Sequence, residues 1–183
     1  PVLDVDSNPR NPVIGDRALS SDPRAVAALG LAFARGSLGA GVLPVGKHFP
    51  GHGATGADSH EELPVVRASR KTLRARDLAP FRAAVRQGIP ALMTAHVLYP
   101  SLDSSLPATL SRRILRDILR EALRFRGVVF SEAGYLLSRC PCWSASRSAV
   151  SAPRATWSSC PGRCARWSAR RRAGSPPSWR RSG

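Results

Sequence analysis

Residues 47–60 read KHFPGHGATGADSH, and three of the four histidines of the 183-residue chain lie within this stretch. Its three glycines make the backbone permissive, which suits a loop that moves over a ligand. Asp58 stands two residues before His60, where a carboxylate can orient an imidazole and raise its pKa for acid–base chemistry. Taken alone, these residues predict either a catalytic loop or a polar surface loop.

A metal site is a weaker interpretation of the same stretch. His48 and His52 are four residues apart, the spacing at which two histidines share one face of a helix. Pro50 and Gly51 lie between them and oppose helix formation. We therefore expect no metal here.

The segments around this loop predict an alternation of strands and helices. Strand-like runs occupy residues 1–5, 42–48, 91–97 and 128–130. Helical patterns lie between them: the first is capped by Ser21 or Asp22, the second covers about 72–86 with an interruption near Pro80, and the third is capped by Ser111. Four strands separated by three helices predict an α/β fold with a parallel sheet, either doubly wound or part of a (βα)8 barrel.

Both architectures gather functional groups at the carboxyl ends of their strands. Polar residues follow each predicted strand: Asp4 and Asp6, Lys47 and His48, His96, and Ser131 and Glu132. The helices should bury apolar faces, with Val26, Leu29 and Phe33 on the first and Leu115, Ile118, Leu119, Ala122 and Leu123 on the third.

Residues 47–60, together with Leu63 and Pro64, resemble the signature of bacterial β-N-acetylhexosaminidases of glycoside hydrolase family 3, the NagZ type. The resemblance continues in order through PVLDVD at 1–6, NPVIGDR at 11–17, MTAH at 93–96, PATLS at 107–111 and GVVFS at 127–131. It implies that residues 1–132 form part of a (βα)8 barrel, with about four of its central strands. The family has further strands on both sides, so we expect a truncated, poorly folded fragment of low activity.

The resemblance also implies an activity and a set of roles. Such enzymes remove terminal β-linked N-acetylglucosamine with retention, typically from peptidoglycan fragments or muropeptides during cell-wall recycling in the cytoplasm, and they use no cofactor or metal. His60, paired with Asp58, would be the general acid/base, an exception to the usual pair of carboxylates. Arg17, Lys47 and His48 would hold the sugar. From the residues alone, without the resemblance to the family, we would interpret Arg17 as a solvated charge on a loop and His96 as a histidine packed in the interior.

Glu132 occupies the position at which the family carries the aspartate nucleophile. A glutamate can attack an anomeric carbon. Its extra methylene moves the carboxylate by ~1.5 Å, and a displacement of about 1 Å can lower a rate roughly a hundredfold. We therefore expect Glu132 to be a nucleophile of reduced efficiency.

Residues 133–183 differ sharply from the rest of the chain. They contain all four Cys, all four Trp and ten Arg but no acid, giving a net charge of +10 against +6 for residues 1–132. This composition predicts a disordered or aberrant basic tail with no domain, and a shifted reading frame in GC-rich DNA would produce it. A zinc module built on the C-x-C and C-x3-C spacings, or an Arg/Trp nucleic-acid segment, are weaker alternatives.

The formal charge of +16 is therefore poor evidence for a nucleic-acid partner. No run of about 18 apolar residues predicts a membrane helix, and no basic start followed by an apolar stretch predicts a leader. Two other functions stay open: a family 3 glycosidase or phosphorylase of different sugar specificity, and a noncatalytic sugar- or nucleic-acid-binding protein.

Overall fold

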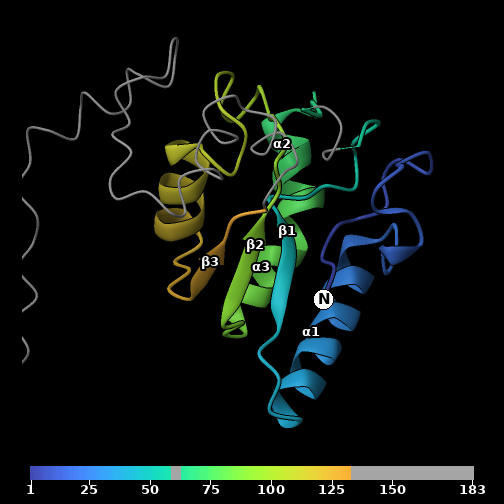
Figure 1. Cartoon of the computed structure of the whole chain (residues 1–183), viewed down its shortest axis with the longest axis vertical. Coiled ribbons are helices and arrows are strands. Elements are labelled where there is room, and N and C mark those ends of the chain that lie inside the picture. Colours follow the sequence, from blue (N-terminus) through green and yellow to red (C-terminus); the bar gives the residue numbers. More distant parts are fainter. Residues whose placement is uncertain (59–62, 133–183) are drawn as a thin grey trace, which may run out of the picture. The chain divides into compact units, whose positions relative to one another are not determined.

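A computed structural model describes residues 1–58 and 63–132, so His60 and the predicted tail lie outside the described residues. Three strands form one parallel sheet in the order β1-β2-β3: β1 (Val45–Phe49), β2 (Ala91–Thr94) and β3 (Val128–Phe130). Helical segments connect the strands in sequence, as Figure 1 shows. This confirms an α/β fold with parallel strands.

The first predicted strand is present only in part. Val2 makes a single parallel bridge to Lys47, whose carbonyl accepts a hydrogen bond of 2.6 Å from the Leu3 N–H. The segment therefore lies beside β1 without forming a regular strand. β1 itself begins three residues later than predicted, directly after Pro44, which has no N–H to donate to a ladder. β3 has the predicted bounds, whereas β2 ends at Thr94 instead of residue 97.

Helix α1 (Pro23–Gly39) begins as predicted, but its buried face is different. The Asp22 side chain accepts the Arg24 N–H at 2.9 Å, and Pro23 occupies the first turn. Leu29 and Phe33, predicted to be buried, are 50% and 62% exposed. Val26 is buried as predicted, but the helix completes its buried face with Gly30 and Ala34, and Gly30 lets it lie close to Leu3.

The second helical stretch is continuous but changes its winding. It consists of α2 (Arg70–Thr72), a π-helical segment η2 (Leu73–Asp77) and α3 (Leu78–Arg86). The helix is not interrupted at the predicted place, since Pro80 lies within α3; the change of winding is the π-helical segment, which ends three residues earlier. Gly88 follows with a φ of +76° and ends the stretch, as glycine can at low steric cost.

The third stretch, η3 (Arg113–Ala122), is π-helical throughout, and this alters which residues it buries. Ser111 does cap it, since its hydroxyl accepts the Ile114 N–H at 3.2 Å. Leu119 is buried as predicted, and Ile118 and Leu123 are partly buried against the core. The second fully buried residue is Ile114, five positions before Leu119, whereas Ala122 is exposed. The prediction assumed 3.6 residues per turn, and a helix with i→i+5 hydrogen bonds places residues five apart on one face.

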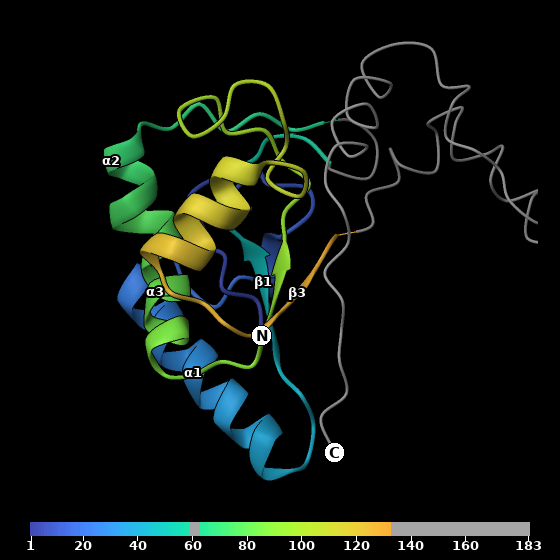
Figure 2. The same ribbon diagram turned by 90° about the vertical axis from the view of Figure 1, so that its left-hand side faces the viewer.

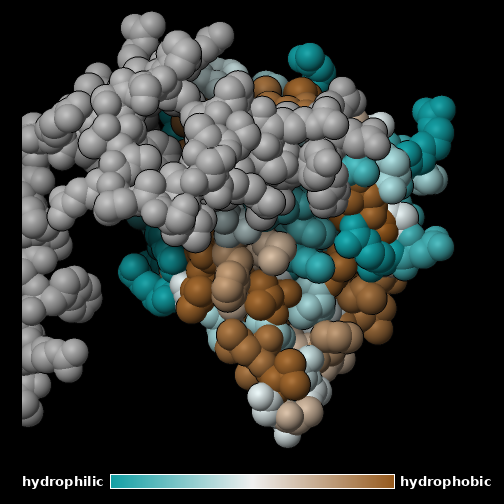
Figure 3. All heavy atoms as spheres, in the orientation of Figure 1, coloured by the Kyte–Doolittle hydropathy of each residue, from teal (hydrophilic) through white to brown (hydrophobic). Residues whose placement is uncertain are grey.

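All of these helices lie on one face of the sheet, as the turned view in Figure 2 shows. Between them is a buried cluster in which Phe49 and Phe81 meet edge to face, with ring centroids 5.4 Å apart. Apolar side chains also reach the surface near the end of α1, where Leu38, Val42 and Leu43 are exposed (Figure 3). The helix-covered face therefore holds the core.

We predict that Gly46→Ala destabilises the fold. A Cβ at Gly46 would lie 2.8 Å from Leu3 Cδ1 and 2.9 Å from Leu92 Cδ2, closer than these buried side chains allow. The free energy of unfolding should fall by about 1–3 kcal/mol, measured by urea titration.

Gly36→Ala is the matched control, because a Cβ at this position in α1 meets nothing within 4 Å. It should leave the urea midpoint unchanged or raise it by the equivalent of about 0.5–1 kcal/mol. Equal effects of the two substitutions would contradict the packing described around Gly46.

Candidate active site

The carboxylate of Asp4 organises the loop that follows β1. Asp4 is fully buried, and its Oδ1 accepts the N–H groups of His48 at 3.1 Å and His52 at 2.6 Å. Its Oδ2 lies 2.8 Å from Nδ1 of the His48 imidazole. A proton on Nδ1 makes this contact a hydrogen bond and leaves Nε2 of neutral His48 as an acceptor. One side chain thus fixes two main-chain positions and one imidazole of the loop.

His52 is enclosed at the centre of this arrangement. Its Nδ1 lies 3.0 Å from the Thr55 hydroxyl, and its ring meets His48 edge to face at 5.6 Å. Its Nε2 is buried with no hydrogen-bond partner among the described residues. Burial lowers the pKa of His52, although the charges of Asp4 and Glu132 partly oppose this effect. His52 is therefore neutral near pH 7.

Two asparagines tie the segment before α1 to the same loop. Asn11 donates to the His52 carbonyl at 2.9 Å, and its own Oδ1 accepts the N–H groups of Val13 and Ile14. Asn8 donates to the Thr55 carbonyl at 2.8 Å. Sequence reasoning missed both residues. The available signal was weak, namely that asparagine favours turns in which its side chain bonds nearby backbone.

The loop also approaches its neighbours so closely that two of its glycines have no room for a side chain. A Cβ at Gly53 would collide with the carbonyl oxygen of Val5, and one at Gly51, where φ is +132°, would lie 2.8 Å from Asp77 Cβ. Tyr99 closes the other side, donating its hydroxyl to the Gly51 carbonyl at 2.7 Å. Tyr99 is fully buried, and burial raises its pKa far above the usual value.

Glu132 lies two residues beyond the end of β3, with only 8% of its surface exposed. Its Oε2 accepts the backbone N–H of His96 at 2.6 Å, and its own N–H donates to the Thr94 hydroxyl at 3.4 Å. The carboxylate is therefore fixed between the ends of β2 and β3. Its negative charge acts to raise the pKa of both His52 and His96. The charge of Glu132 therefore acts on His52 in the loop that follows β1, which we call the histidine loop (residues 50–58).

His96 is buried, as expected of a packed histidine. Burial lowers its pKa against the opposing charge of Glu132, and its Nδ1 has no partner in the part of the chain that the structure describes. The side chains of His52 and His96 thus both bring an unpartnered ring nitrogen to the carboxyl edge of the sheet.

The predicted sugar-binding residues lie on two different segments. Lys47 and His48 belong to β1, where Lys47 is half-buried. Arg17 ends the short helix η1 (Gly15–Arg17), is exposed, and donates its Nε to the Val13 carbonyl at 3.2 Å. No hydrogen bond or ion pair joins Arg17 to Lys47 or His48 among the described residues. Their common role in sugar binding stays a prediction.

The predicted pair of Asp58 and His60 is likewise untested. Asp58 is described and half-buried, whereas His60 lies outside the described residues.

Within residues 1–58 and 63–132, no group of three or more His, Cys, Asp or Glu side chains is arranged to hold a metal ion. The same residues form no helix long and apolar enough to cross a membrane.

Comparison with known proteins assigns this arrangement to a family. A family model described as the glycosyl hydrolase family 3 N-terminal domain matches residues 1–152. The chain belongs to glycoside hydrolase family 3. It is 49% identical over 132 residues to a β-hexosaminidase of Thiobacillus denitrificans, an alignment that covers 72% of this chain and 36% of that protein.

Solved family 3 structures superpose on the chain. A β-N-acetylglucosaminidase from Paenibacillus sp. gives a TM-score of 0.73 at 46% identity, covering 75% of this chain and 26% of the other. NagZ from Neisseria gonorrhoeae, in complex with N-trifluoroacetyl-D-glucosamine, gives 0.68 at 47% identity, covering 72% and 38%. The chain thus spans about a third of the length of these family 3 relatives.

We predict that Asp4→Asn disrupts this family 3 loop. An amide at this position retains only one acceptor oxygen, so buried N–H groups of His48 or His52 lose their partner. The free energy of unfolding should fall by about 2–3 kcal/mol, measured by urea titration. Asp6→Asn is the matched control, since Asp6 forms its hydrogen bond to Ser20 through the backbone N–H. The control should change stability by less than about 0.5 kcal/mol.

We also predict that the chain loses stability on mild acidification. The pKa values of His52 and His96 are both below 6.5 in the folded state, so the unfolded state binds protons first as the pH falls through 6.5. Urea midpoints should therefore decrease from about pH 7.5 to 5.5, a window above the usual carboxylate range. His96→Gln removes one of these groups and should flatten the decrease. An identical slope in the variant would exclude a contribution from His96.

Proposed function

We propose that residues 1–132 form the carboxyl-end active site of a retaining β-N-acetylglucosaminidase acting on peptidoglycan-derived fragments in the cytoplasm. The observation that carries the proposal is the meeting of the Asp4-ordered histidine loop with Glu132 at one edge of a parallel sheet. The ligand in the NagZ structure from Neisseria gonorrhoeae is an N-acylglucosamine analogue, which supports this class of sugar.

The proposed roles combine the position of Glu132 with the resemblance of residues 47–60 to the family motif. Glu132 attacks the anomeric carbon to form a glycosyl-enzyme, while His60, oriented by Asp58, protonates the departing glycosidic oxygen. The same imidazole then removes a proton from the water that releases the sugar. The His96 N–H holds Oε2 of Glu132, which leaves Oε1 to make the bond. Lys47, His48 and Arg17 bind the hydroxyl and N-acetyl groups.

We further propose that the sheet is an arc of a (βα)8 barrel. Its helices cover one face only, and alternate residues of β3 face the other side. Val128 and Phe130 on that side are 54% and 41% exposed, whereas Val129 is partly buried against the helices. Further strands that closed a barrel would bury Val128 and Phe130.

The proposal is tested by grafting residues 1–132 in place of the aligned 132 residues of the Thiobacillus denitrificans β-hexosaminidase. We expect the chimaera to hydrolyse an aryl N-acetyl-β-glucosaminide. His60→Gln and Glu132→Gln should each lower kcat by at least about a hundredfold, because each removes a group that reacts with the sugar. Glu132→Asp should raise kcat by up to about a hundredfold by withdrawing the carboxylate to the family position.

Glu121→Gln is the control for a lost carboxylate, since Glu121 forms an exposed ion pair with Arg116. It should leave kcat unchanged. An unaffected Glu132→Gln chimaera would exclude Glu132 as nucleophile, and a product that requires added phosphate would identify a phosphorylase instead.

A further inference from the structure

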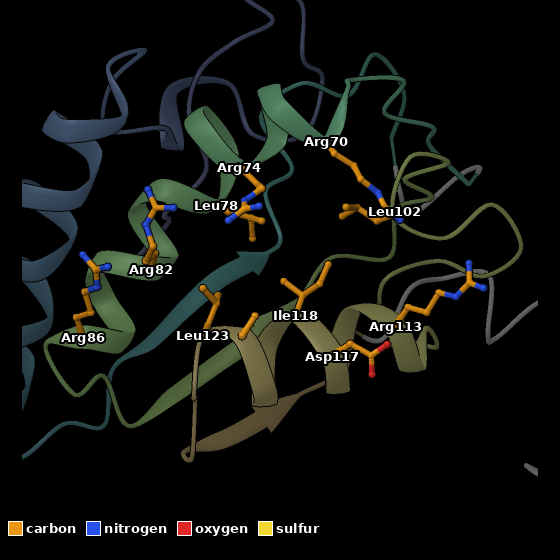
Figure 4. A pocket seen from close by; sticks show the side chains of 11 residues that line it. Arg70, Arg74, Leu78, Arg82, Arg86, Leu102, Arg113, Asp117, Ile118 and Leu123 are labelled. Carbon is orange, nitrogen blue, oxygen red and sulfur yellow. The ribbon is translucent and has the colours of Figure 1, made fainter.

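A second surface of the molecule, formed by the helical segments that cover the sheet, has a distinct chemistry. A cavity of about 790 Å³ lies between the α2–α3 stretch and η3. Figure 4 shows Arg70, Arg74, Arg82 and Arg86 along one side and Arg113 with Asp117 along the other. We call this surface the arginine groove. Five cations and one acid line it, so it is strongly positive.

The arginines of the helical stretch follow a regular spacing. Arg70, Arg74, Leu78, Arg82 and Arg86 are each four residues apart, and all five line the cavity although the stretch passes through the π-helical segment η2. From Arg70 to Arg86 the row extends on the order of 20 Å along the helical stretch. A single phosphate or sulfate ion would meet only a small part of it. The row fits an elongated ligand with repeated negative charges.

The floor of the groove is apolar. Leu78 and Leu102 are nearly buried, and Ile118 and Leu123 point into the same space from η3 and its C-terminal end (Figure 4). Among residues 1–58 and 63–132, no aromatic side chain lines the cavity. Single-stranded nucleic acids use aromatic rings to stack their bases, so this floor is poorly suited to them. It suits aliphatic side chains.

Most of the groove arginines make no side-chain hydrogen bond or ion pair in the described part of the chain, although Arg70 donates its Nε to the Ser101 carbonyl. Among the described residues, the arginine ion pairs join Arg76 to Asp77 and Arg116 to Glu121, and neither involves a residue that lines the groove. The chain itself offers no suitable occupant. Residues 133–183 contain no Asp or Glu, and two copies of a chain with a net charge of +16 repel each other.

We propose that the arginine groove binds an acidic amphipathic helix of a partner protein. Glutamates or aspartates at four-residue spacing on that helix pair with the arginine row, and leucine-like side chains on its adjacent face fill the apolar floor. Guanidinium groups match carboxylates in bidentate geometry, which favours arginine over lysine at such a surface. This use of the groove is independent of the proposed glycosidase activity.

The test uses the full 183-residue chain and a fluorescent helical peptide of about 18 residues, with Glu at every fourth position and Leu on the adjacent face. Binding is measured by fluorescence anisotropy at fixed salt. Arg74→Glu combined with Arg82→Glu should weaken binding at least about tenfold, because two attractions become repulsions. Replacing the leucines of the peptide by serine should also weaken binding.

Arg24→Glu combined with Arg35→Glu is the matched control. Both residues are exposed on α1, and the pair changes the net charge by the same amount. It should leave the affinity within about twofold. Urea titration of the Arg74→Glu, Arg82→Glu variant should give an unchanged midpoint, which shows that the variant is folded.

Three results would overturn the proposal. If the two double variants lowered the affinity for the peptide equally, binding would depend on the net charge of the chain and not on the groove. Undiminished binding of the serine peptide would exclude the apolar floor. An oligonucleotide or a phosphatidylglycerol vesicle that requires Arg74 and Arg82, when the acidic peptide does not bind, would assign the groove to a different class of ligand.

Discussion

The buried carboxylate of Asp4 is the interaction on which the rest of the candidate site depends. A carboxylate removed from water is costly unless its oxygens accept hydrogen bonds, and Asp4 accepts them from the backbone of His48 and His52 and from an imidazole. The loop after β1 and the segment that carries Asp4 therefore stabilise each other. Neither has its observed shape independently of the other.

Glu132 extends this dependence across the sheet. It is held by the His96 backbone beyond β2, while its charge reaches His52 within the loop after β1. Parallel strands make this possible because their carboxyl ends meet at one edge. Burial disfavours the charged imidazoles, and the two carboxylates partly compensate. The pKa of His52 thus depends on Asp4, His48 and Glu132, which come from three separate parts of the chain, whereas Glu132 alone opposes the effect of burial on the pKa of His96.

The sequence was sufficient to predict those features of the fold and family that depend on local residue patterns and short motifs. The parallel α/β class, the Asp22 cap and β3 follow from turn residues and β-branched runs, and the family from the motif at 47–60. Its prediction of the buried faces of α1 and η3 is confirmed for Val26 and Leu119 and wrong for Leu29, Phe33 and Ala122. Leu29 is exposed because α1 packs through small residues, and Ala122 because π-helical winding shifts the apolar face. The roles of Asn11 and Tyr99 depend on partners more than 40 residues away.

The close approach of Gly53 to the Val5 carbonyl determines how the loop can change over evolutionary time. A clash between two side chains can be relieved by shortening one of them, but the obstacle at Gly53 is main chain, which no substitution removes. Gly56, by contrast, meets only Asn8 Nδ2, at 3.8 Å, and has room for a Cβ. Position 56 of this loop can therefore accept a residue with a side chain in the course of evolution, whereas position 53 must stay glycine.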